Sequence, residues 1–120
     1  MNIVIIGSGN VAAILGRKFL KAGHSIVQIY SRNASAASEL AYEWDTESTN
    51  YKSLIVKNAD VYIIAVSDTA IEEVVDDLSF PGKVVAHTAA SVPKEILQHV
   101  TSHYGVFYPL QSLRKEMTDL

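Results

Sequence analysis

The chain of 120 residues contains no cysteine. Disulfides, thiolate metal sites, iron–sulfur clusters and a cysteine nucleophile are therefore excluded. The absence of cysteine fits a reducing compartment, and we expect the protein in the cytoplasm.

Long apolar runs and an excess of basic residues are also missing. Polar residues such as Asn10, Arg17 and Lys18 interrupt the apolar start, so no apolar stretch approaches the roughly 18 residues of a membrane-spanning helix. Ten Lys and Arg stand against thirteen Asp and Glu, which gives a net charge of −3. This balance does not favour binding to a phosphate backbone. We expect neither a membrane nor a nucleic acid as partner.

Several catalytic signatures are absent as well. No Gly-Lys-Ser/Thr triplet closes a mononucleotide P-loop, and no Gly-x-Ser-x-Gly elbow supports a serine hydrolase. His99 and His103 are four residues apart, but no further ligands complete a metal site, so we expect no metal. The acidic pairs at 72–73 and 76–77 are interpreted as the solvated face of one helix.

What the chain does contain is an alternation of short apolar runs and helical patterns. Strands are predicted at residues 2–6, 25–30, 61–66, 83–86 and 104–107, with a short additional strand at 43–46. Helices are predicted at 10–22, 34–42, 51–58 and 93–100, and a further helix runs from an Asp68 cap to about Leu78. This order predicts an α/β fold: one domain with a doubly wound, mostly parallel sheet in three layers, helices covering both faces.

The loop after the first predicted strand carries the motif G-x-G-x-x-A at residues 7–12. Gly7 allows a tight turn, Gly9 lets the backbone approach a pyrophosphate, and Ala12 lets the helix pack closely on the strand. The free N–H groups and the dipole at the helix start favour an anion. The motif predicts a dinucleotide-binding domain, which we expect to span residues 1–120. The alternative is that these small residues only make a tight connection.

The end of the second predicted strand indicates which dinucleotide binds. An NAD site usually has Asp or Glu there, whereas this chain reads Ser31, Arg32 and Asn33. The Arg32 guanidinium would attract a 2′-phosphate that a carboxylate would repel. We therefore expect NADP in preference to NAD. Arg32 could alternatively be a solvated surface residue or stack on the adenine.

Polar residues also follow the later strands, at the sheet edge where ligands of such folds bind. Val66 and Ser67 are expected near the ribose and pyrophosphate. The predicted cofactor-binding residues are Gly7, Ser8, Gly9, Asn10, Val11, Ala12, Ser31, Arg32, Asn33, Val66, Ser67, His87 and Thr88.

Three residues are candidates for a catalytic role. His87 could donate a proton or a hydrogen bond to a substrate carbonyl, or it could bond to the backbone of its own loop. Thr88 and Ser91 could donate hydrogen bonds to the nicotinamide or the substrate, and Ser91 could instead cap the following helix.

These motifs together resemble the Rossmann-like N-terminal domain of a family of NADP oxidoreductases. The resemblance rests on the segments 7–12, 30–32, 65–68, 87–91 (His-Thr-Ala-Ala-Ser) and 107–111 (Phe-Tyr-Pro-Leu-Gln). The family is similar to pyrroline-5-carboxylate reductases and to deazaflavin-dependent NADP oxidoreductases. Relatives often have glycine in place of Ala90 and histidine in place of Tyr108, so no acid/base role is carried over to Tyr108.

The resemblance implies hydride transfer between NADP(H) and a small imine or carbonyl substrate, with the nicotinamide supplying the chemistry. It also implies a C-terminal helical domain, absent from this chain, that provides the dimer interface and one wall of the substrate pocket. We therefore expect the isolated chain to bind cofactor and to be inactive or weakly active. Two alternatives remain open: a non-catalytic nucleotide-sensing or interaction module, and a binder of another nucleotide-type cofactor.

Overall fold

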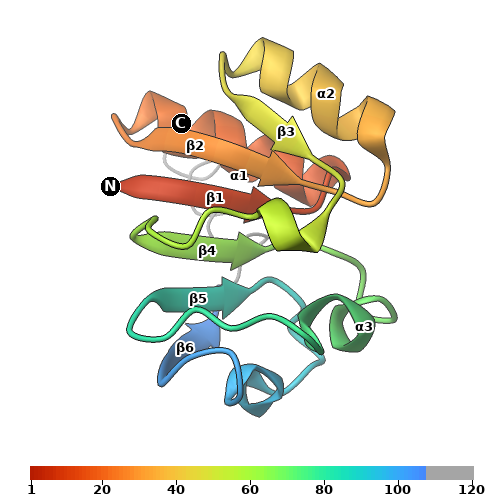
Figure 1. Ribbon diagram of the computed structural model, residues 1–120, viewed down its shortest axis with the longest axis vertical. Helices are drawn as coiled ribbons and strands as arrows, with labels where there is room; N and C mark the ends of the chain where they lie inside the picture. Colours follow the sequence, from red (N-terminus) through yellow and green to blue (C-terminus); the bar gives the residue numbers. More distant parts are fainter. Residues whose placement is uncertain (108–120) are drawn as a thin grey trace, which may run out of the picture.

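Six parallel strands form one sheet in the computed structural model, which describes residues 1–107 (Figure 1). The strands are β1 (Asn2–Ile6), β2 (Ser25–Tyr30), β3 (Glu47–Thr49), β4 (Val61–Ile64), β5 (Val84–His87) and β6 (His103–Val106). The helices are α1 (Asn10–Lys21), α2 (Ala34–Glu43) and α3 (Ile71–Val75), and two short 3-10 helices are η1 (Lys52–Leu54) and η2 (Lys94–Leu97). No helix within this part of the chain is long and apolar enough to cross a membrane.

The strand order is β3-β2-β1-β4-β5-β6, and each neighbouring pair is parallel. The chain runs outward from β1 to β3, returns to place β4 beside β1, and then runs outward again to β6. This is the doubly wound Rossmann order, so the predicted fold is confirmed. The direction reverses between β1 and β4, and the carboxyl ends of those two strands are where ligands of such sheets bind.

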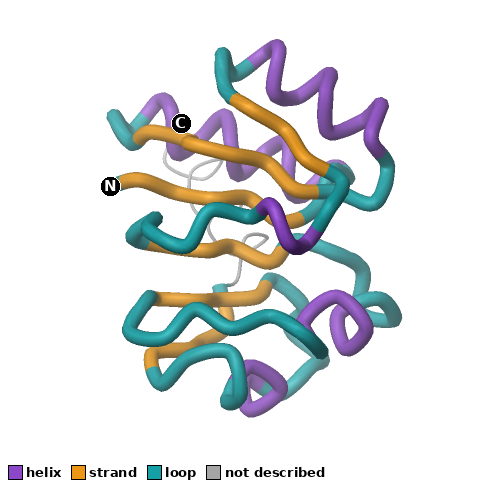
Figure 2. Tube along the Cα trace, in the orientation of Figure 1, coloured by secondary structure: helices purple, strands orange, loops and turns teal. Residues whose placement is uncertain are grey.

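Successive side chains of β1 face the two helical layers in turn, as the pleat of a strand requires. Ile3 and Ile5 belong to an apolar cluster with Leu15 of α1, whereas Val4 and Ile6 belong to a cluster with α3. The helices and the connecting segments thus cover both faces of the sheet (Figure 2). A strand buried on both faces accounts for the continuous apolar run at the start of the sequence.

Five of the six strands and the first two helices follow the sequence expectations closely. β1 and β2 have the predicted bounds, and α1 and α2 differ from prediction by one residue at their ends. Asn33 caps α2 as expected, because its Oδ1 accepts a hydrogen bond from the Ala36 backbone N–H at 3.1 Å. β4, β5 and β6 each lie within one or two residues of their predicted bounds.

The short strand predicted at 43–46 is wrong, since β3 lies at Glu47–Thr49. Trp44 ends α2 and is buried, and Asp45 takes a positive φ of 52° that turns the chain. The apolar residue thus serves the helix packing, and the polar segment after it pairs with β2 at the sheet edge.

The helix predicted at 51–58 is also wrong, because only the single turn η1 forms there. The buried side chain of Gln28 donates to the Leu54 carbonyl and accepts from the Val56 N–H, both at 2.9 Å. Tyr62 Oη donates to the Val56 carbonyl at 2.6 Å. Side chains from the sheet therefore satisfy the backbone groups that a helix would have paired internally.

The two remaining predicted helices are shorter than expected. The helix predicted at 93–100 is only η2, because Pro93 remains extended with ψ 146°. α3 spans five residues and begins after Ala70 without a side-chain cap. Asp68 is therefore not the predicted N-cap: its carboxylate accepts a hydrogen bond from Ser91 Oγ, across to the loop after β5. Ser91 does not cap η2 either, because η2 begins after Pro93 with no side-chain cap.

We expect Gly16→Ala to destabilise the protein, although this change usually stabilises a helix. A Cβ at Gly16 would lie 2.2 Å from Cζ2 of the buried Trp44 ring. The usual gain of about 1 kcal/mol in helix propensity is then outweighed by overpacking, which typically costs about 1–3 kcal/mol. Urea unfolding should show a net loss of about 1 kcal/mol. In a Trp44→Leu background the same substitution should be stabilising, and a gain in the wild-type background would contradict this account.

Candidate functional site

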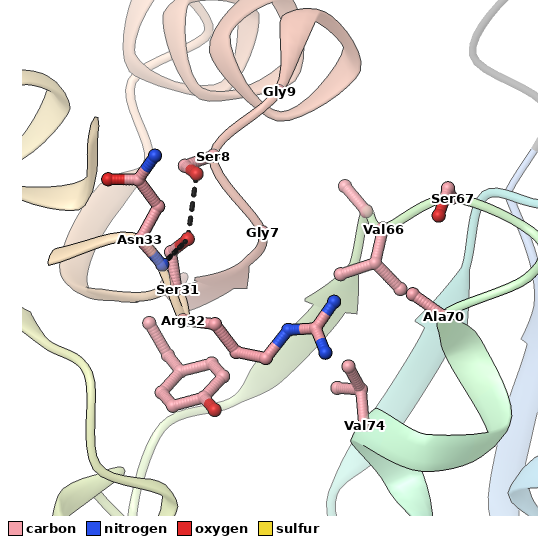
Figure 3. Close-up of a pocket in the computed structure, with 12 residues that line it drawn as sticks. Gly7, Ser8, Gly9, Ser31, Arg32, Asn33, Val66, Ser67, Ala70 and Val74 are labelled. Atoms are coloured by element: carbon pink, nitrogen blue, oxygen red, sulfur yellow. Dashed lines mark hydrogen bonds between the residues drawn. The ribbon is translucent and has the colours of Figure 1, made fainter. Parts of the chain in front are cut away.

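A crevice of about 300 Å³ opens at the carboxyl ends of β1, β2 and β4. It lies where the strand order reverses, between the loop after β1 and the loop after β4. Figure 3 shows its lining residues: Gly7, Ser8, Gly9, Tyr30, Ser31, Arg32, Asn33, Ala65, Val66, Ser67, Ala70 and Val74.

Gly7 is required by the fold itself. Its φ is +126°, a conformation that other residues rarely adopt, and its N–H donates to the Tyr30 carbonyl at 2.7 Å. A Cβ at this position would lie 2.2 Å from the carbonyl oxygen of Ala65. Gly7 therefore lets the end of β1 pass directly against the end of β4.

Gly9 has a different reason for being glycine. Its φ of −80° and ψ of −168° suit any residue, and a Cβ there would meet no atom of residues 1–107 within 4 Å apart from its chain neighbours. The fold thus does not need glycine here. The open approach leads to the first turn of α1, where no described side chain caps the N–H groups. These features fit a phosphate group that comes close to the backbone.

Three predicted polar residues are connected by hydrogen bonds between the loops after β1 and β2. The hydroxyl oxygens of Ser8 and Ser31 lie 2.7 Å apart, and the Asn33 N–H donates to Ser31 Oγ at 3.1 Å (Figure 3). Ala12, the last residue of the motif, lies on α1 and is fully buried in the same apolar cluster as Ile3 and Ile5 of β1. The two serine hydroxyls thus hold the two loops together beside the crevice.

Arg32 is exposed and extends across the mouth of the crevice toward Val66, Ala70 and Val74 (Figure 3). Its Nη1 donates to Oε1 of Glu73 on α3 at 3.4 Å, and the two side chains remain 60% and 73% exposed. The end of β2 supplies no carboxylate, but α3 places one opposite Arg32. The interpretation of residues 72–73 as a solvated face missed this pairing.

Sequence reasoning also missed the apolar wall of the crevice. Ala70 and Val74 lie one helical turn apart across the start of α3, and Tyr30 and Ala65 come from strand ends. The spacing of four between the two α3 residues was the available signal. The predicted contacts follow the strands directly, whereas Ala70 and Val74 lie further along the chain, at the start of α3.

A neighbouring crevice of about 290 Å³ shares Gly9 and residues 65–67 with the first. Asn10, Val11 and Thr88 line it, so the structure brings these predicted residues together. Ser91 lies apart, in a depression with Lys94 and Val106, and it donates a hydrogen bond to Asp68, which lines the second crevice.

His87 is completely buried, and both of its ring nitrogens are engaged within its own loop. Nδ1 accepts from the Ala89 N–H at 3.0 Å, so Nε2 carries the proton and faces the Pro93 carbonyl at 3.3 Å. The crevice linings do not include His87. These two bonds favour the alternative role of His87, in which it bonds to the backbone of its own loop.

The remaining sequence features lie outside the crevice or outside the described residues. His99 bonds to the Val75 carbonyl at the end of α3 through Nε2, at 2.7 Å. The Tyr-Pro-Leu-Gln segment at 108–111 lies outside the described residues.

Comparisons with known proteins agree with this geometry. Residues 2–91 match the family described as NADP oxidoreductase, coenzyme F420-dependent. A candidate NADP oxidoreductase from Bacteroides fragilis superposes with a TM-score of 0.80 at 35% identity, over 89% of this chain and 43% of that one. No curated protein matches the chain.

Two further structures share the fold at lower identity. A 1-pyrroline-5-carboxylate reductase from Streptococcus pyogenes has a TM-score of 0.66 at 22% identity, over 84% of this chain and 38% of that one. An imine reductase from Aspergillus terreus has a TM-score of 0.68 at 18% identity, over 87% and 38%. The chain thus spans less than half the length of each of these proteins.

The matched segment contains the glycine loop, Arg32 and all strands from β1 to β5. Together with the Rossmann strand order and the crevice at its reversal point, this match establishes that the chain belongs to the NADP oxidoreductase, coenzyme F420-dependent, family and forms a nucleotide-binding domain of that oxidoreductase type.

Proposed function

We propose that this domain binds NADP(H), in preference to NAD(H), as the cofactor half of an enzyme that transfers hydride to or from a small imine or carbonyl compound. One observation carries the proposal. A single crevice joins the open backbone approach at Gly9 to the Arg32 guanidinium, and the end of β2 beside it bears no carboxylate. Pyrophosphate and 2′-phosphate are the anions that such a pair of features suits.

The proposed contacts divide the crevice by chemistry. The N–H groups at the start of α1 bind the pyrophosphate, and Arg32 binds the 2′-phosphate. The apolar pair Ala70 and Val74 offers a surface for the adenine. The bonded hydroxyls of Ser8 and Ser31 hold the two phosphate-binding loops in register. When bound, the nicotinamide supplies the hydride chemistry.

The second crevice is proposed for the reacting end of the cofactor. Asn10, Val11 and Thr88 line it, and the Thr88 hydroxyl is a donor for the nicotinamide or the substrate. His87 acts as a positioning residue, because it fixes the loop that carries Thr88. Ser91 is a candidate for substrate contact from the adjoining depression.

The imine or carbonyl substrate is supported by the names of fold neighbours that reduce pyrroline-5-carboxylate or imines. We further propose that a helical domain outside this chain completes the substrate pocket and the homodimer, and that the protein is cytoplasmic. The 120-residue chain alone would then bind cofactor and turn over substrate weakly or not at all.

The cofactor assignment is tested by calorimetric titration of NADP and NAD into the chain and its Arg32→Ala variant. Loss of a charged hydrogen bond costs about 1.5–3 kcal/mol, so NADP affinity should fall at least about tenfold while NAD affinity barely changes. Arg17→Ala is the matched control, because Arg17 is exposed and pairs with Glu43 on α2 rather than lining the crevice. An equal loss for both cofactors would contradict the 2′-phosphate role. No binding of either at millimolar concentration would contradict the site.

The role of Gly9 is tested by Gly9→Val, which should separate binding from folding. The unfolding free energy should fall by no more than about 1 kcal/mol, the usual cost of a poor N-cap residue. Affinity for both dinucleotides should fall at least about tenfold, equivalent to about 1.4 kcal/mol. Gly105→Val is the control, because a Cβ there also meets open space but lies on β6. Wild-type affinity in Gly9→Val would show that the loop is only a tight connection.

A further inference from the structure

Arg32 and Glu73 face each other across the mouth of the crevice from two different elements. Arg32 follows β2, and Glu73 belongs to α3 between the two crevice-lining residues Ala70 and Val74. The Arg32 Nη1 and Glu73 Oε1 atoms are 3.4 Å apart. The guanidinium that would bind a 2′-phosphate therefore already has an anionic partner.

Lys52 anchors the backbone of α3 at Glu73. From η1, its Nζ donates to the Glu73 backbone carbonyl at 2.9 Å and to Asp77 Oδ1 at 2.8 Å. The hydrogen bond from Lys52 holds the pKa of Asp77 below its usual value, so this anchor persists into mildly acidic solution. Because Lys52 anchors the α3 backbone at Glu73 itself, the base of the Glu73 side chain stays near Arg32 when the ion pair opens.

The carboxylate acts differently on the two dinucleotides. A 2′-phosphate must displace Glu73 from Arg32, or share the guanidinium with it, and the two anions repel each other. A 2′-hydroxyl carries no charge and suffers neither effect. Both side chains of the pair are more than half exposed. The effect of Glu73 on the difference in affinity between the two cofactors is therefore modest and sensitive to salt.

We infer that Glu73 is a specificity-determining residue, which competes with the cofactor 2′-phosphate for Arg32 and so narrows the preference for NADP over NAD. The inference rests on the proposed function, in which Arg32 binds that phosphate. Cofactor choice would then depend on an acidic residue that lies outside both the glycine motif and the end of β2.

The test is calorimetric titration of NADP and NAD into the 120-residue chain and its Glu73→Gln variant. Glutamine keeps the size of the side chain and removes its charge, and the site is exposed, so folding should be unaffected. NADP affinity should rise about two- to fivefold, the range expected for an exposed ion pair, while NAD affinity stays the same. The gain should shrink at about 1 M salt, where the screening length falls to about 3 Å.

Glu72→Gln is the matched control, since it removes the same charge from the neighbouring residue of the same helix. A double variant with Arg32→Ala shows whether Glu73 acts through Arg32, in which case the gain in NADP affinity should largely disappear. If Arg32→Ala weakens NADP binding but Glu73→Gln has no more effect than Glu72→Gln, the inference is overturned and the proposed function stands. If the wild-type chain does not bind NADP, both are overturned.

Discussion

The close passage of Gly7 over the end of β4 is the constraint on which the rest of the site depends. The Gly7 N–H pairs with the Tyr30 carbonyl, the Ala65 N–H pairs with the Ile6 carbonyl, both at 2.7 Å, and the missing side chain leaves room for the Ala65 carbonyl. The carboxyl ends of β1, β2 and β4 are therefore bonded to one another at Gly7. The loop that follows leads directly into the N-terminus of α1.

Local sequence predicted those parts of the fold that local physics determines. The apolar run of β1, the periodicity of α1 and the Asn33 cap of α2 each have their cause within a few residues, and each was located closely. The helix predicted at residues 51–58 does not form, because side chains of Gln28 and Tyr62 take the backbone hydrogen bonds of this segment. Gln28 in particular lies far from the segment in sequence and reaches it only in the folded chain.

The residues of the candidate site likewise divide into those that the local sequence identifies and those that only the folded structure brings together. The glycine loop and Arg32 were identifiable because the strand-to-helix connection brings its own residues to the sheet edge. The local sequence did not identify the α3 residues Ala70, Glu73 and Val74 as part of the site. The helix α3 reaches the crevice only because it packs on the sheet and bonds to Lys52. His87 looked reactive because its type and position suit catalysis, but the fold uses both ring nitrogens to shape the loop after β5.

The short, polar strand β3 affects the tendency of the protein to self-associate. It forms one edge of the sheet, contains only three residues and includes a charged side chain, Glu47. Long, apolar edges offer a row of unpaired backbone groups that invite a further strand and lead to aggregation. This edge offers almost no such template, so lengthening of the sheet on the β3 side is disfavoured at high concentration.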